Sequence, residues 1–275
     1  MIDVRAARWF DAAGKRAAAP DCTAAAVLKE APEAGVYRVT FLGQPAALKV
    51  RDHRTIRKVL RATRHRAVLD HERRMIDRAR DAGLPAPQVL GWGERRLWGL
   101  VIQQSLLTAF HDGRVEMVHR VQRAAAEGDA ADLAGNLNAM VRFCAQLRAA
   151  GLSDADFSIK HLLLDPSPRS AIEPLWIDLE AVTEAAADDS EATARTTGAA
   201  LWSWWVATAG DQASLRDALS QFRAALPQPP GGWDALLPLV NQTIQQKWRK
   251  VTRTGRFQAE PPTLHGSASI PLSLL

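Results

Sequence analysis

Residues 152–164 read LSDADFSIKHLLL, and residues 175–179 read LWIDL. The first segment places Asp156 and, five positions later, His161 ahead of an aliphatic run. The second delivers Asp178 at the end of an apolar strand, where a carboxylate is a suitable hard ligand for Mg²⁺. An aspartate that only caps a turn is the plain alternative for Asp178. Taken in this order, the two segments predict a site for phosphoryl transfer.

Length and composition describe an ordinary folded protein. The chain has 275 residues, 47% of them hydrophobic and 24% charged, which is enough to bury a sizeable core. Its net charge of +5 favours anionic partners such as a nucleotide, nucleic acid or an acidic membrane surface. Cys22 and Cys144 lie too far apart in the sequence to suggest a zinc site or a disulfide framework.

The first hundred residues predict a small sheet with one helix. Residues 26–50 contain strand-like runs broken by glycine and proline, and Lys49 lies at the end of the third run. Apolar residues at helical spacing predict one helix over 55–82. Two further strands, 89–93 and 98–104, follow, separated by a charged turn at Glu94, Arg95 and Arg96.

Beyond Leu106 the pattern becomes mainly helical. We predict an amphipathic helix over 132–150, an alanine-rich helix carrying three tryptophans, and a last helix over about 233–251. The tryptophans Trp202, Trp204 and Trp205 could form a sugar-stacking platform, but in such a helix core packing is the favoured interpretation. No signal peptide precedes the first strand, and no run reaches the roughly 18 apolar residues of a membrane span. We therefore expect a protein that is cytoplasmic or attached only to a membrane surface.

Four segments together carry a family resemblance: ALKV at 47–50, the helical Glu72, DFSIKHLLL at 156–164 and WIDL at 176–179. In this order they resemble the protein-kinase-like fold, over roughly residues 27–206. The closer resemblance is to the lipopolysaccharide core kinase family, because His161 stands where protein kinases carry the catalytic-loop asparagine. The resemblance implies an α+β, two-lobed fold, and the change of pattern near 104–107 divides it into a nucleotide-binding lobe at 1–105 and a catalytic and acceptor lobe at 106–255. The proline, serine and glycine content of 256–275 predicts a mobile tail.

The same resemblance implies a role for each site residue. Lys49 would bind the phosphates of ATP, and Glu72 would pair with it. Asp156 would accept or orient the proton of the attacking hydroxyl, while Asp178 and His161 would hold Mg²⁺. The acceptor would be a sugar hydroxyl, a heptose or Kdo of the lipopolysaccharide inner core. The plain alternatives are a surface lysine, a helix-surface glutamate and a structural histidine.

Several positions depart from the protein-kinase pattern. Asp154 and Ala155 replace the His-Arg that precedes the catalytic aspartate, so Asp154 is a second candidate for the role of Asp156. The first turn, residues 30–35, contains one glycine instead of a glycine-rich loop. Glu180 stands where protein kinases carry the glycine of Asp-Phe-Gly. With no segment for docking a protein substrate, a small or glycolipid acceptor is favoured.

The sequence contains two basic stretches. One follows the strand of Lys49, and the other lies at the end of the last predicted helix. Their members are Arg51, Arg54, Arg57, Lys58, Arg61, Arg64 and Arg66, and then Lys247, Arg249, Lys250, Arg253 and Arg256. A solvated surface is one interpretation of both. The other is contact with anionic lipid or with phosphates of a lipopolysaccharide core, at the cytoplasmic face of the inner membrane.

The sequence leaves three alternative functions to consider. A small-molecule kinase resembling aminoglycoside or choline phosphotransferases would need an acidic acceptor pocket, which the basic stretches argue against. A kinase-like binding protein without activity is suggested by the poor phosphate loop, although Lys49, Glu72, Asp156 and Asp178 are all present. Nucleic acid is not expected as a partner, because no aromatic interleaving accompanies the arginines.

Overall fold

The computed structural model describes residues 6–64, 66–166, 173–186, 188–228, 231–252 and 264. The chain divides into two compact units. The first comprises residues 1–113 and 178–180, and the second comprises 114–177 and 181–275. Of the predicted tail at 256–275, only Leu264 lies within the described residues; its backbone N–H and C=O both bond to Asn241.

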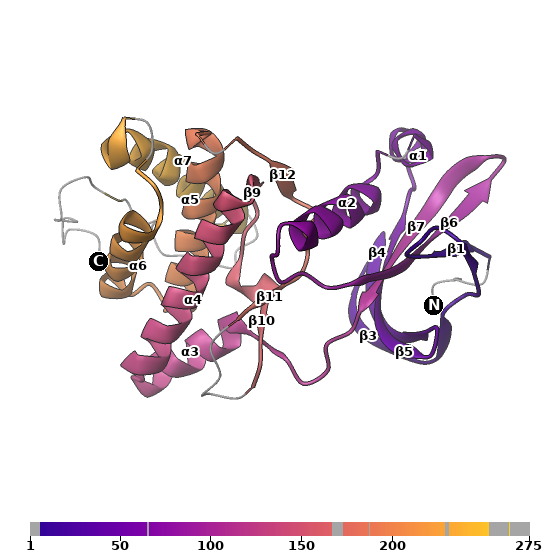
Figure 1. The fold of residues 1–275 in the computed structure, drawn as a ribbon, viewed down its shortest axis with the longest axis horizontal. Coiled ribbons are helices and arrows are strands. Elements are labelled where there is room, and N and C mark those ends of the chain that lie inside the picture. The colour runs from indigo at the N-terminus through magenta and orange to yellow at the C-terminus, as the bar shows by residue number, and fades with distance from the viewer. Residues whose placement is uncertain are drawn as a thin grey trace. The chain divides into compact units, whose positions relative to one another are not determined.

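An antiparallel sheet forms most of the first unit (Figure 1). Its order is β2-β1-β6-β7-β5-β4-β3. The strands are β1 (Arg8–Asp11), β2 (Arg16–Ala17), β3 (Asp21–Ala31), β4 (Ala34–Phe41), β5 (Gln44–Asp52), β6 (Val89–Leu97) and β7 (Leu100–Ala109). The sequence pattern did not predict β1 and β2. Trp9 of β1 is nevertheless buried in the same core cluster as Phe41, Leu48 and Leu107.

The range predicted as one helix, 55–82, contains two: α1 (Ile56–Thr63) and α2 (Val68–Asp81). Ala62 and Ala67 are both buried in one small cluster with Val101 of β7. In a continuous helix, residues five positions apart point about 140° away from each other, so both could not face Val101. The chain therefore turns between them, and the apolar periodicity alone could not show this.

Two hairpins of the sheet end in turns of the same backbone conformation. The turn between β4 and β5 has φ of 48° at Leu42 and 80° at Gly43, and that between β6 and β7 has 48° at Trp98 and 81° at Gly99. Two successive positive φ values belong to the type I′ turn, which suits a twisted hairpin and favours glycine at its second position. The predicted turn at 94–96 was wrong, since those residues continue β6.

The second unit is mainly helical, as predicted for the chain beyond Leu106 (Figure 1). Its helices are α3 (Met117–Glu127), α4 (Ala130–Ala149), α5 (Ser190–Ala207), α6 (Gln212–Ala225) and α7 (Gly232–Thr252). Short strands accompany them: β8 (Val115–Glu116), β10 (Leu162–Leu164) and β11 (Leu175–Trp176) form one sheet, and β9 (Leu152–Asp154) and β12 (Val182–Glu184) form another. Among the described residues, no helix is long and apolar enough to cross a membrane.

Helix α5 organises the second unit. Its tryptophans Trp202, Trp204 and Trp205 are buried, which confirms the core interpretation. Gly198 of α5 lies so close to α7 that an added Cβ would come within 2.8 Å of the backbone oxygen of Val240. Glycine at this position therefore allows the two helices to approach closely.

Candidate active site

Strand β5 and helix α2 bring Lys49 and Glu72 together in the first unit. Leu48 and Val50, the neighbours of Lys49 on β5, are buried, so the alternation of the strand directs Lys49 to the opposite face. Its Nζ donates to Oε1 of Glu72 at 2.7 Å and to Oε2 at 3.0 Å. It also donates to Oδ1 of Asp178 at 2.8 Å. One ammonium therefore joins two of the predicted site carboxylates.

The contact between Lys49 and Glu72 is shielded from solvent. The Glu72 side chain is only 4% exposed and that of Lys49 20%. Burial lowers the pKa of Lys49, but the charges of Glu72 and Asp178, and the hydrogen bonds to them, more than offset this and raise its pKa. Lys49 is therefore a fixed positive charge, as a group that stabilises phosphate needs to be.

Asp178 lies in a short segment with an unusual backbone. Its φ is 65°, in the left-handed region that aspartate tolerates better than most residues. The next residue, Leu179, is fully buried. After it, Glu180 forms an ion pair with Arg51, which lies two residues beyond Lys49 on the same face of β5. The buried leucine and the two ion pairs thus hold the segment 178–180 in place.

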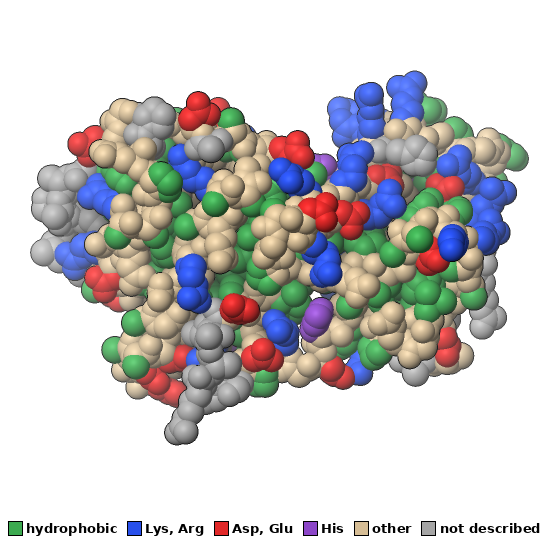
Figure 2. Space-filling view, viewed as in Figure 1, with side chains coloured by type: hydrophobic (Ala, Val, Ile, Leu, Met, Phe, Trp, Pro, Cys, Tyr) green, Lys and Arg blue, Asp and Glu red, His purple; other side chains and the backbone are tan. Residues whose placement is uncertain are grey.

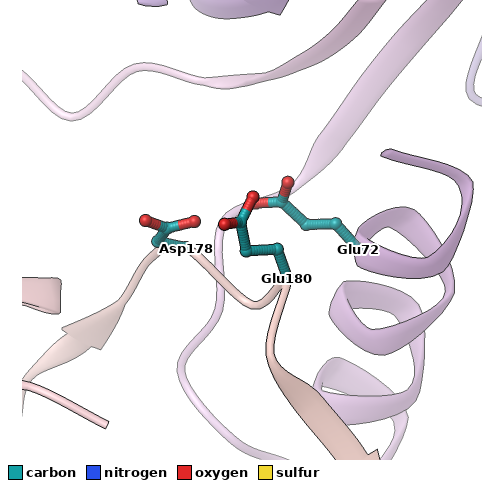
Figure 3. A group of neighbouring side chains, drawn as sticks. All are labelled: Glu72, Asp178 and Glu180. Atoms are coloured by element: carbon teal, nitrogen blue, oxygen red, sulfur yellow. The ribbon is translucent and has the colours of Figure 1, made fainter. Parts of the chain in front are cut away.

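Glu72, Asp178 and Glu180 have carboxylate oxygens that all lie within 4.8 Å of one another (Figure 3). Figure 3 shows Glu72 projecting from α2 and the other two from the segment after β11. We call these three carboxylates, with Lys49 and Arg51, the Lys49 cluster. Sequence reasoning did not assign a role to Glu180, although its position two residues after Asp178 was the available signal.

The donor set of the Lys49 cluster is suited to a divalent cation. Hard carboxylate oxygens are the ligands that Mg²⁺ prefers. Both Glu72 oxygens already bind Lys49, whereas Asp178 and Glu180 are each partly exposed. The three carboxylates of the Lys49 cluster outnumber its two cations, Lys49 and Arg51, so the cluster carries one net negative charge. The residues that would hold a metal are therefore Asp178 and Glu180.

Asp156 and His161 lie in the second unit, in a loop that α5 anchors. Ser203 of α5 accepts a hydrogen bond from the backbone N–H of Ile159, and Thr196 accepts one from Asp154. His161 ends a short 3-10 helix, Ile159–His161. Among the described residues, the carboxylate group that could hold a metal does not include His161.

Asp154 and Asp156 occupy different environments. Asp154 is buried, and its Oδ1 accepts a hydrogen bond from the backbone N–H of Asp156 at 2.9 Å. It therefore helps to shape the loop. The side chain of Asp156 is 50% exposed, so a substrate hydroxyl could reach it. Of the two aspartates, Asp156 therefore has the environment that the predicted role of proton acceptor requires.

Two lysines of α7 face Asp156. The Nζ atom of Lys247 lies 2.5 Å from Oδ1 of Asp156, and that of Lys250 lies 3.8 Å from it. Burial raises the pKa of Asp156, but the hydrogen bond from Lys247 and the charges of Lys247, Lys250 and His161 outweigh it, so the pKa is lowered. We call Asp156, His161 and the two lysines the Asp156 cluster. The sequence had placed both lysines in a basic stretch without linking them to Asp156.

The sequence model of one protein family matches residues 35–192, more than half of the chain. Its description is "Lipopolysaccharide kinase (Kdo/WaaP) family". The chain belongs to this family. It is accordingly a kinase, of a family named for lipopolysaccharide. The match includes all of the predicted site residues from Lys49 to Asp178.

Solved structures agree on the fold of this lipopolysaccharide kinase family member. One is described as WaaP in complex with acyl carrier protein, with a TM-score of 0.54 and 18% identity over 82% of this chain and 87% of that one. Another is a rhoptry antigen kinase domain of Toxoplasma gondii, with a TM-score of 0.53 and 11% identity over 92% of this chain and 89% of that one. No curated protein sequence matches the chain. The predicted protein-kinase-like α+β fold is confirmed.

Proposed function

We propose that this kinase transfers the γ-phosphoryl group of ATP to a sugar hydroxyl, a heptose or Kdo of the lipopolysaccharide inner core, in a reaction that depends on Mg²⁺. Family membership supports the reaction class. The observation that carries the assignment of residues is the bonding of Lys49 to both Glu72 and Asp178. A single preorganised ammonium beside partly exposed carboxylates suits a nucleotide and its metal.

Each residue of the Lys49 cluster has a distinct proposed role. Lys49 binds the α- and β-phosphates, and Glu72 holds its ammonium in position. Asp178 and Glu180 hold the metal, which when bound neutralises the negative charge of the phosphates. Arg51 holds Glu180 in place through their ion pair. Because these charges are fixed before the nucleotide binds, little reorganisation is needed during the reaction.

Asp156 acts on the acceptor in this proposal. An aspartate is ionised at neutral pH, and the lowered pKa of Asp156 extends its ionised form to more acidic pH. The carboxylate can therefore orient the sugar hydroxyl and accept its proton. Lys247 restrains the carboxylate through Oδ1. In this role Lys247 is a positioning residue. His161, predicted as a metal ligand, is instead proposed to add positive charge near Asp156 when it is protonated.

The first test is phosphate transfer from radiolabelled ATP to purified lipopolysaccharide core acceptors. We expect transfer by the unmodified protein and its loss in Asp156→Ala and Asp178→Ala. Asp217→Asn is the matched control, because Asp217 is exposed on α6 and belongs to neither cluster. Mg-ATP binding without transfer to any sugar would favour the rival hypothesis of an inactive binding protein.

A further inference from the structure

Exposed hydrophobic side chains gather on one part of the first unit. Six of the ten large ones found among the described residues belong to α1, the start of α2 and the turn between β6 and β7. They are Ile56, Leu60, Val68, Leu97, Trp98 and Leu100. Trp98 is 91% exposed at the tip of the turn. A tryptophan in this position contributes nothing to the core, and its exposure calls for a partner.

The helix and the turn belong to one surface. The backbone N–H of Val101, just after the turn, donates to Oγ1 of Thr63 at 3.0 Å. Ala62 of α1 is buried against the same Val101. The C-terminal end of α1 is therefore joined to the base of the hairpin that carries Trp98. We call the exposed residues of α1 and residues 97–100 the α1–hairpin surface.

Positive charge accompanies these hydrophobic side chains. Residues 53–69 contain six lysines and arginines and no acidic residue. Arg57, Arg61 and Arg64 repeat at helical spacing beside the exposed pair Ile56 and Leu60. Within the described part of the chain, no acidic side chain pairs with these three arginines. Figure 2 shows lysine and arginine side chains gathered over α1, with hydrophobic ones next to them.

We propose that the α1–hairpin surface docks the protein onto an anionic lipid bilayer, with Trp98 inserted among the lipid headgroups. Tryptophan is enriched at the interface between membrane and water, where its ring meets both environments. Apolar residues interleaved with arginines are the composition of interfacial segments that bind anionic lipid. A surface that was only solvated would expose the arginines without the tryptophan and the leucines.

The two basic stretches differ in what their charged side chains contact. Lys247 of the second stretch is engaged with Asp156, and residues 253–256 lie outside the described part of the chain. Among the described residues, no acidic side chain pairs with Arg57 or Arg61 of α1. The bilayer contact is therefore assigned to the first unit, through α1 and the hairpin.

The test is sedimentation of the full chain with vesicles, without ATP or acceptor, so that its result is independent of the proposed kinase reaction. Vesicles of phosphatidylethanolamine and phosphatidylglycerol are compared with vesicles of phosphatidylcholine. We expect binding to the first kind only, and its loss in high salt. Each basic residue near an anionic surface strengthens binding about fivefold. The triple variant Arg57→Gln, Arg61→Gln, Arg64→Gln should thus bind on the order of 100-fold more weakly.

Trp98→Asn should weaken vesicle binding about tenfold, since it removes the inserted side chain. Leu42→Asn is its matched control, because Leu42 is 62% exposed and has the same φ in the same kind of turn. Asparagine tolerates that backbone conformation, so neither change should unfold the protein. Lys160→Gln, Arg216→Gln, Arg249→Gln controls for the charge lost in the arginine triple, because these residues are exposed in the second unit.

Four results would overturn the proposal. The unmodified protein could fail to bind anionic vesicles. The charge control could lose as much binding as the arginine triple, which would show attraction by net charge alone. Leu42→Asn could lose as much as Trp98→Asn, which would show that the apolar contact is not confined to this surface. The protein could also be retained on an immobilised acidic protein through Arg57, Arg61 and Arg64 while ignoring vesicles, and the partner would then be a protein. Kinase activity in solution is measured separately and decides none of these.

Discussion

The Lys49 cluster and the Asp156 cluster have opposite charge balances. In the first, three carboxylates surround Lys49 and Arg51. In the second, one carboxylate faces two lysines. The first is suited to a cation and the second to an anionic or polarised oxygen. The difference agrees with the roles proposed above: metal and nucleotide at the first cluster, and the acceptor oxygen at the second.

The carboxylates of the two clusters also differ in burial, although Lys49 and Lys247 are about equally buried. Glu72 is nearly excluded from solvent, whereas half of the Asp156 side chain is exposed. A buried ion pair depends on both partners, while an exposed one is screened by water. We therefore expect substitutions in the Lys49 cluster to affect stability and activity together, and substitutions in the Asp156 cluster to affect mainly activity.

The largest effect should come from Asp156→Asn. Loss of the proton acceptor should lower kcat by about 10²–10⁴-fold while Mg-ATP binding stays unchanged, because the nucleotide is assigned to the other cluster. Steady-state kinetics and calorimetric titration with Mg-ATP measure the two quantities. If Mg-ATP affinity fell along with kcat, the division of roles between the clusters would be wrong.

Asp178→Asn should act through the metal. We expect the Mg²⁺ concentration for half-maximal activity to rise by about 10–100-fold, because one of two proposed carboxylate ligands is lost. Activity measured over a series of Mg²⁺ concentrations gives this value. Asp217→Asn should leave it unchanged. A variant whose activity falls equally at all Mg²⁺ concentrations would remove Asp178 from the metal site.

A double-mutant cycle compares the two ion pairs directly. Lys49→Met and Glu72→Gln should show a coupling free energy of about 1–3 kcal/mol in urea unfolding, because the pair is buried. The corresponding cycle with Lys247→Met and Asp156→Asn should show less than about 1 kcal/mol, because solvent screens the pair. Equal couplings would mean that the difference in burial has no energetic consequence.

The smallest effect concerns pH. Lys247 lowers the pKa of Asp156, so the aspartate stays ionised to a lower pH than usual. Lys247→Gln removes that charge and raises the pKa, and the acidic limb of the kcat/KM profile should move to higher pH. Lys247→Arg should largely restore the profile. Arg249→Gln, on the same helix but exposed, serves as the control.

If Lys247 only supported the packing of α7, Lys247→Gln would lower activity without moving the acidic limb of the kcat/KM profile. Carbon-13 NMR titration of the aspartate carboxylates, assigned with Asp156→Asn, tests the same pKa without any substrate. An unchanged Asp156 titration in Lys247→Gln would show that Lys247 does not tune this carboxylate.

The order of strands β3 to β7 and the helical second half could be predicted because glycine, proline and apolar spacing act over a few residues. The break between α1 and α2 could not, since it depends on burying Ala62 and Ala67 against Val101 from another element. The same holds for β1, whose Trp9 is buried only because the strand pairs with β6.

By itself the sequence determined the kinase family, and with it the order of Lys49, Glu72, Asp156 and Asp178 along the chain. Only the tertiary structure decided which charges meet. Lys247 contacts Asp156, 91 positions earlier in the chain, because α5 both anchors the loop of Asp156 and packs closely on α7 through Gly198. Motifs are local and can be found in a sequence, whereas the neighbours of a charge are set by the packing of distant elements.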